Sequence, residues 1–388
     1  MNKKKIGCVI AYRKNHTNYG TALVGYALLQ KIHQLGYDVE VINYIKRPTM
    51  TQKVAWVVNA FRCGMGDSVI ERFREKGNLK NNPSYAEGIK QRTEAVETYK
   101  EEKLIPLFKD YVGYEALHEG SKNYETVIVG SDQVWTPMSL PTKFFNLLFV
   151  DDTVRKVAYA SSFGVSEIPS FQKERTGAYL NRFYRIGVRE QRGKDIVDAL
   201  SCQTAQVVAD PTLLLNADEW NEEIKNSQVT VNEPYIFCYF LGTNIEARKA
   251  AEELKRKTNF KIITLRHMDE YVPEDEQFGD EAPYCVNPND FLTYIKNAAY
   301  ICTDSFHCTA FSIQFHKQFM TFYRFKAESS TGRNSRIDSL FNVLGVNKDH
   351  IYNDDIRFIE SPIDWETVDA NLIRLRENSM DFLKEALK

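Results

Sequence analysis

The sequence lacks paired cysteines, long apolar runs and an excess of charge of either sign. None of its seven cysteines stands in a Cys-x-x-Cys pair, which argues against a disulfide framework or a zinc site and favours reduced thiols in a cytosolic protein. No segment approaches the roughly 20 apolar residues that span a bilayer. Fifty basic residues against 52 acidic ones give a net charge of −2, so the chain as a whole is not attracted to nucleic acid or to a membrane.

The start of the chain carries a basic tip and then an apolar run that is too short for the core of a signal peptide. We therefore expect a cytoplasmic protein with no transmembrane segment and no nucleic-acid partner. A peripheral position on the inner face of the membrane stays open, and the sequence does not determine the oligomeric state.

The sequence does contain a repeated alternation of strand and helix patterns. Residues 5–12 form an apolar run typical of a buried parallel strand, and residues 39–43 form a second. Between them, Leu23, Ala27 and Leu28 trace one face of a helix. Since parallel strands are joined by such crossovers, this unit predicts a parallel sheet.

The alternation continues over most of the 388 residues, which are enough for two domains. We expect an N-terminal Rossmann-like domain over residues 1–210 and a C-terminal one over residues 211–362, both doubly wound α/β units. Residues 363–388 carry the apolar stripe of a long terminal helix.

Residues 47–120 interrupt the first unit with a highly charged segment of helical periodicity. We interpret them as a helical insertion in which Phe61, Phe73, Tyr99 and Tyr111 are intermittent apolar anchors. The insertion either borders a substrate cleft or is a solvated excursion, and the sequence does not decide between the two.

One stretch, residues 300–322, contains several residues that could bind a ligand or move a proton. It predicts a buried strand, a sharp turn, an amphipathic helix and a second short strand. Ser305 is one of three consecutive residues that can cap the helix, and His307 falls in its first turn. Helix amides at the carboxyl edge of a parallel sheet favour an anion, beside which an imidazole can move a proton. A structural histidine is the alternative.

Polar residues also follow two other predicted strands. Asp132 and Trp135 come after the buried run 126–129, where the carboxylate is either a helix cap or a base and the ring is either core or a sugar platform. Arg189 and Glu190 end the strand RIGVRE. Their alternatives are a surface ion pair of little energetic weight or a bidentate grip on an anion.

Two loops complete the set of candidates. The loop from residue 13 to Gly20, with Asn18 in it, is polar and tight, so it either holds a ligand or turns the chain. A Ser/Gly-rich basic loop precedes a helix that begins near residue 334 and contains Arg336. Such a loop is either a phosphate lid or a solvated surface, and as a lid its residues 327–333 should be poorly ordered without ligand.

Five motifs follow one another in the order of a known family. They are N-x-G-x-x-L from residue 18, G-S-D-Q-V-W from 130, V-R-E from 188, T-D-S-F-H-C-T-A-F-S-I from 303 and N-S-R-I-x-x-L from 334. Together they resemble the polysaccharide pyruvyl transferase family. This resemblance implies a GT-B-like fold, with two Rossmann-like domains facing across a cleft and the terminal helix packing back on the N-terminal domain. The acceptor would bind on the N-terminal side and the donor on the C-terminal side.

The resemblance also implies a reaction. The pyruvyl group of phosphoenolpyruvate would be transferred to two hydroxyls of a sugar, giving a pyruvate ketal and phosphate. The acceptor would be a sugar, a polysaccharide or a lipid-linked saccharide, with phosphoenolpyruvate as substrate and no cofactor or metal. The alternatives are a GT-B glycosyltransferase that uses a nucleotide sugar and a family member without catalytic activity.

Each motif residue then receives a role. His307 is the proton donor and Asp132 the base, and the donor is bound by four residues: Arg189, Ser305, Thr309 and Arg336. The acceptor is bound by Asn18, Gly20 and Trp135. Some relatives carry a cation just before the histidine, whereas here Ser305 and Phe306 precede it, so the phosphate depends more on helix amides and arginines.

Overall fold

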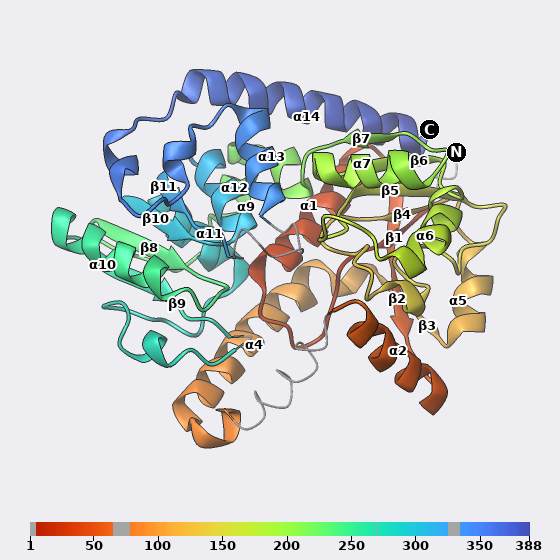
Figure 1. Cartoon of the computed structure of the whole chain (residues 1–388), viewed down its shortest axis with the longest axis horizontal. Helices are drawn as coiled ribbons and strands as arrows, with labels where there is room; N and C mark the ends of the chain where they lie inside the picture. The colour runs from red at the N-terminus through yellow and green to blue at the C-terminus, as the bar shows by residue number, and fades with distance from the viewer. Residues whose placement is uncertain (1–4, 65–77, 269, 325–333) are drawn as a thin grey trace.

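The computed structural model describes residues 5–64, 78–268, 270–324 and 334–388, which form two parallel sheets flanked by helices (Figure 1). The first sheet has the strand order β3-β2-β1-β4-β5-β6-β7 and the second the order β11-β10-β8-β9. Each order reverses direction, at β1/β4 and at β8/β10, as in a doubly wound sheet. The predicted α/β class with two Rossmann-like, GT-B-like units is confirmed. The loop segment 327–333, expected to be a lid, lies outside the described residues.

The strands are short and largely buried. Those of the first sheet are β1 Lys5–Val9, β2 Asp38–Ile45, β3 Phe108–Val112, β4 Thr126–Val129, β5 Arg155–Ser161, β6 Arg185–Val188 and β7 Ala205–Val207. Those of the second sheet are β8 Tyr235–Tyr239, β9 Lys261–Leu265, β10 Tyr300–Thr303 and β11 Gln318–Thr321. Parallel strands that helices cover on both faces read as continuous apolar runs, which explains why the central ones could be predicted.

The helices cover both faces of each sheet (Figure 1). In the first half of the chain they are α1 Tyr19–Gln34, α2 Met50–Arg62, α4 Pro83–Lys103, α5 Tyr114–Ser121, α6 Lys173–Leu180 and α7 Gln191–Leu200. In the second half they are α8 Pro211–Leu214, α9 Ala217–Ile224, α10 Ile245–Thr258, α11 Pro288–Asn297, α12 Phe306–Gln314, α13 Ser335–Leu344 and α14 Trp365–Leu387. None of the described helices is long and apolar enough to cross a membrane.

Helix α1 joins the two halves. Its Tyr19 ring stacks on Phe291 of α11 with the ring centroids 4.7 Å apart, and the Tyr19 hydroxyl donates a hydrogen bond of 3.1 Å to the carbonyl of Val286. Eleven of its 16 residues are buried. A helix enclosed to this extent fixes the carboxyl edge of β1 against the second half of the chain.

The segment 47–120 differs from the expected helical insertion. Residues 108–112 form β3, an edge strand paired with β2, and only Tyr111 of this strand is buried. An edge strand exposed on this scale carries no apolar run, so the sequence could not reveal it. Phe61 is not an anchor either, because 54% of it is exposed. The anchor Phe73 lies outside the described residues.

Helix α4 of the same segment packs between the halves and is not a solvated excursion. Its Arg92, 1% exposed, donates hydrogen bonds to the carbonyls of Tyr284 and Pro283 at 2.7 and 2.9 Å. The Lys100 ammonium donates to the carbonyls of Arg13 and His16. These bonds hold the loop after β1 in place from one side.

Helix α14 runs along the top of both halves in Figure 1. On the first sheet, the Ser379 hydroxyl accepts a hydrogen bond of 2.8 Å from the amide of Ala209, and the Phe382 ring lies 6.2 Å from that of Tyr159. The Arg185 guanidinium pairs with Glu385 at 3.0 Å. The last two turns of the chain thus lie against β5 to β7.

Candidate active site

The two switch points of the sheets meet at one place. The loop after β1 and the turn after β4 come from the first switch point, and the start of α12 follows β10 at the second. Gly20 of α1 lies directly against the imidazole of His307. Ligands of α/β proteins bind at such points, so the sequence order places the candidate residues where a ligand is expected.

His307 lies in the first turn of α12, as the sequence predicted. Ser305 is the N-cap of that helix, and its hydroxyl accepts a hydrogen bond of 3.4 Å from the amide of Cys308. The imidazole is 9% exposed, and its Nε2 lies 3.7 Å from Oδ2 of Asp210. That is an ion-pair distance and is too long for a hydrogen bond. Nε2 is buried and has no hydrogen-bond partner in the protein.

Gly20 leaves no room for a side chain. A Cβ at this position would lie 2.1 Å from Nδ1 of His307. We therefore expect Gly20→Ala to displace the imidazole. With His307 in the proton-donor role that the motif implies, this should lower turnover about 100-fold, since a displacement of about 1 Å in an active site has that effect. The matched control is Gly25→Ala in the same helix, where the Cβ would meet only the tip of Ile10 at 3.1 Å. Steady-state kinetics of the two variants test this, and unchanged turnover of Gly20→Ala would contradict it.

Arg189 is a buried cation among carboxylates. Its side chain is 1% exposed, and its Nη1 donates a hydrogen bond of 2.9 Å to Oδ2 of Asp210. The N–H groups of its other edge make no hydrogen bond and only two long ion pairs: Nε lies 3.8 Å from Glu190 and Nη2 lies 3.9 Å from Asp132. A buried guanidinium with one edge that makes no hydrogen bond is suited to a bidentate anion.

Asp132 faces this edge from the turn after β4. Its φ of +87° is a backbone region that non-glycine residues rarely adopt and that is enriched at functional sites. The Thr21 hydroxyl and the Gln133 amide donate hydrogen bonds of 2.9 and 2.8 Å to its carboxylate. Burial raises the pKa of Asp132, but Arg189 and His307 outweigh burial and bring the pKa below its ordinary value. Asp132 is therefore an ionised carboxylate.

Sequence reasoning missed two acids at this edge. Asp210, which was placed at the domain boundary, links Arg189 and His307 and accepts a hydrogen bond of 3.1 Å from the Ser131 hydroxyl. Burial raises its pKa, but His307 and Arg189 hold the pKa well below the usual range. The only local signal was an Asp-Pro pair, which caps α8.

Glu190 is the second missed acid. It accepts a hydrogen bond of 2.8 Å from the Ser162 hydroxyl through Oε1, whereas Oε2 is buried without a partner. Burial raises the pKa of Glu190 above its ordinary value even though Arg189 lowers it. A carboxyl group with a raised pKa beside an anion site is a candidate proton carrier. The V-R-E motif could have indicated Glu190, but the binding role was assigned to the Arg of that motif.

Arg336 joins the site from α13. Its guanidinium lies over the Phe306 ring at 5.7 Å, and that of Arg189 lies 4.9 Å from the centroid of the same ring. Burial and the repulsion from Arg189 lower the pKa of Arg336 to about 9. The two arginines lie on one ring and repel each other. A dianion bound between them would reduce this repulsion. Phe306 thus lies against both guanidinium groups.

Thr309 and Trp135 have enclosed environments. The Thr309 hydroxyl donates a hydrogen bond of 3.1 Å to the carbonyl of Ser305 and contacts the Thr321 hydroxyl. The Trp135 ring is 3% exposed, packs on Phe163 and donates from Nε1 to the carbonyl of Phe145. Both side chains are buried and bonded within the protein, and the binding roles expected of them stay predictions.

The loop after β1 and the β2 end enclose a cavity beside Asp132. Asn18 caps α1 through a hydrogen bond of 3.2 Å from the amide of Thr21 and does not line the cavity. The cavity has a volume of about 420 Å³, and its lining includes Thr21, Asp132 and the aromatic rings of Tyr12, Tyr44, Phe108 and Phe144. Aromatic walls with a few polar groups are typical of ligand pockets.

Comparisons with known proteins identify one family for most of the chain. A family model described as polysaccharide pyruvyl transferase matches residues 18–324. No curated protein matches the chain. Among the described residues, no group of three or more His, Cys, Asp and Glu side chains could hold a metal ion.

Among solved structures, UDP-GlcNAc 2-epimerase from Neisseria meningitidis bound to UDP-GlcNAc is similar at 8% identity and a TM-score of 0.49, covering 97% of this chain and 93% of that chain. The E. coli ADP-heptose lps heptosyltransferase II has 9% identity and a TM-score of 0.34, over 95% and 99% of the two chains. The substrates of these proteins are not transferred to this chain at such low identity.

Proposed function

The chain belongs to the polysaccharide pyruvyl transferase family, and from this premise we propose that it transfers the pyruvyl group of phosphoenolpyruvate to a saccharide and forms a ketal. The observation that carries the proposal is the edge of Arg189 that makes no hydrogen bond: its buried Nε and Nη2 have only long ion pairs, and Arg189 and His307 lie near the same carboxylate oxygen of Asp210. A planar carboxylate matches that edge in a bidentate manner. Arg336 and the amides at the start of α12 would then hold the phosphate.

The reaction requires one proton donor and one base. His307 would protonate the methylene carbon of phosphoenolpyruvate through Nε2, which turns the neighbouring carbon into an electrophile. A sugar hydroxyl would attack that carbon while Asp132 accepts its proton, giving a tetrahedral phosphate ester. Phosphate would leave with the proton held by Asp132, and a second hydroxyl would attack the same carbon and give its proton to the now neutral His307, which closes the ketal. Arg189 and Arg336 would stabilise the charge of these states.

The acceptor side of the proposal rests on the cavity beside Asp132. A saccharide in this cavity would lie against the rings of Tyr12 and Tyr44 with a hydroxyl directed at the Asp132 carboxylate. The hydrogen bond from Thr21 keeps that carboxylate turned toward the cavity lined by both residues. Thr21 and these rings therefore form part of the proposed acceptor site.

The test is product analysis with phosphoenolpyruvate and candidate saccharides. We expect acceptor-dependent release of phosphate, with the mass of the saccharide increased by a pyruvate ketal. We further expect Asp132→Asn to lose about two to four orders of magnitude in turnover and to retain donor binding, since it removes the base alone. Consumption of a nucleotide sugar and formation of a glycoside would overturn the proposal in favour of glycosyl transfer.

A further inference from the structure

Helix α2, residues Met50–Arg62, projects from the lower edge of the first sheet at a distance from α14 (Figure 1). Five large apolar side chains on it are between 45% and 72% exposed: Met50, Val54, Val57, Val58 and Phe61. Their spacing of three and four residues puts them on one stripe along the helix. Ala60 is the only fully buried residue of the helix. An exposed apolar stripe of this kind marks a surface that binds something.

The charged residues of α2 and of the segment just before it have one sign. Residues 45–64 contain Lys46, Arg47, Lys53 and Arg62 and no acidic residue. We propose that α2 is an interfacial helix that docks the protein on an anionic phospholipid bilayer, with the stripe in the acyl boundary and the cations among the headgroups. A helix with an apolar face and only basic charges is the kind that lies in the plane of such an interface.

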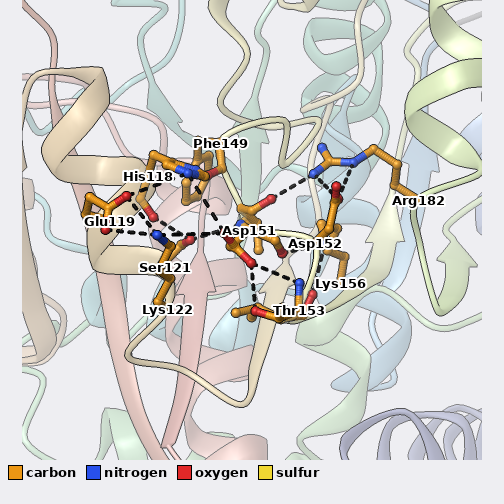
Figure 2. Close-up of polar contacts among 12 residues, drawn as sticks. His118, Glu119, Ser121, Lys122, Phe149, Asp151, Asp152, Thr153, Lys156 and Arg182 are labelled. Carbon is orange, nitrogen blue, oxygen red and sulfur yellow. Dashed lines mark hydrogen bonds and ion pairs between the residues drawn. The ribbon is translucent and has the colours of Figure 1, made fainter.

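A cationic cavity beside α2 supports an anionic partner. It has a volume of about 670 Å³, and its lining includes Asn59, Arg62, Lys143, Arg175 and Arg182 but no Asp or Glu. Arg182 donates hydrogen bonds to Asp152, as Figure 2 shows, and to the carbonyl of Val150. Of the other three cations, Arg62 lies over the Phe171 ring and Lys143 over the Tyr114 ring, contacts that leave their charge without an acidic partner in the lining. The same charges disfavour a second copy of the chain, because pairing two α2 helices would bring like charges together.

The position of α2 also connects it to the acceptor cavity. Tyr44 and Lys46, which line that cavity, lie six and four positions before the first residue of α2, Met50. Lys46 additionally lies 5.8 Å from the centre of the Trp56 ring on α2. A bilayer on α2 would therefore adjoin the cavity, which fits a saccharide carried on a lipid. This last step rests on the proposed function, whereas the docking itself does not.

The test is co-sedimentation with vesicles made of phosphatidylcholine and phosphatidylglycerol in equal parts. We expect the wild type to bind these vesicles, and Val58→Glu to bind at least about tenfold more weakly because it loses apolar burial and adds a charge of the lipid's sign. Lys53→Glu with Arg62→Glu should weaken binding at least as much. The matched control is Ile373→Glu on α14, since Ile373 and Val58 are both 51% exposed; it should bind like the wild type.

Each contrary outcome overturns the inference. One is that the wild type does not sediment with the vesicles; another is that Val58→Glu and Ile373→Glu bind equally. In a third, the wild type does not bind vesicles but forms a dimer without lipid in sedimentation velocity, and Val58→Glu dissociates this dimer. The stripe would then be the interface with a second copy of the chain. Phosphate release with a water-soluble saccharide should be unchanged in Val58→Glu, so failure of docking and failure of pyruvyl transfer are measured separately.

Discussion

Replacing His307 by glutamine is expected to lower turnover by about two to four orders of magnitude while phosphoenolpyruvate still binds nearly as well as to the wild type. Glutamine has roughly the size of histidine and can donate a hydrogen bond, but it cannot deliver a proton to carbon. Because Nε2 of His307 has no hydrogen-bond partner in the protein, the substitution breaks no internal hydrogen bond at this atom. Donor binding by titration calorimetry, beside phosphate release, separates the two effects.

The matched control is His350→Gln. His350 is buried too, and its Nδ1 lies 2.9 Å from the carbonyl of Phe319, away from the site. We expect this variant to lose stability and to keep its turnover. If His307→Gln retains wild-type turnover, His307 is a structural histidine and the proposed mechanism is wrong.

Replacing Arg189 is expected to have the opposite effect, with loss of donor binding first. Arg189→Ala removes one partner of a buried charge pair, which weakens binding by about 2 to 5 kcal/mol, or roughly 30-fold or more. It also leaves the buried Asp210 without its cation, so reduced stability is expected. Arg189→Lys separates these effects: it keeps a charge for Asp210 but has no second N–H edge for a carboxylate.

Calorimetric titration of Arg189→Lys with phosphoenolpyruvate is the measurement, and thermal unfolding checks the fold. The control is Arg248→Lys, because Arg248 is also a buried arginine paired with a buried carboxylate, Asp275, outside the site. Arg248→Lys should bind the donor normally. If Arg189→Lys binds phosphoenolpyruvate as well as the wild type does, the guanidinium of Arg189 does not hold the donor.

The parts of the site that could be predicted are those set by local order. Polar residues directly after apolar runs had to lie at the carboxyl edge of a parallel sheet, which located Asp132, Arg189 and His307. Ser305 is the helix cap that its residue type suggested. In these cases the neighbouring residues decide the position of the side chain.

The parts that could not be predicted depend on what packs across the molecule. Asp210 acts through partners 21 and 97 positions away in the chain, so nothing near it marks its role. Trp135 follows a strand end but turns into a core of aromatic rings, and only the fold decides that choice. Gly20 was assigned to the acceptor, whereas the structure shows that its missing side chain makes room for His307.

The most direct measurement of the central claim is the crystal structure of the protein soaked with phosphoenolpyruvate. We predict density for the donor with its carboxylate within hydrogen-bond distance of Nε and Nη2 of Arg189 and with its methylene carbon toward Nε2 of His307. Donor density elsewhere on the molecule, or an empty site at donor concentrations that saturate the calorimetric titration, would contradict the account.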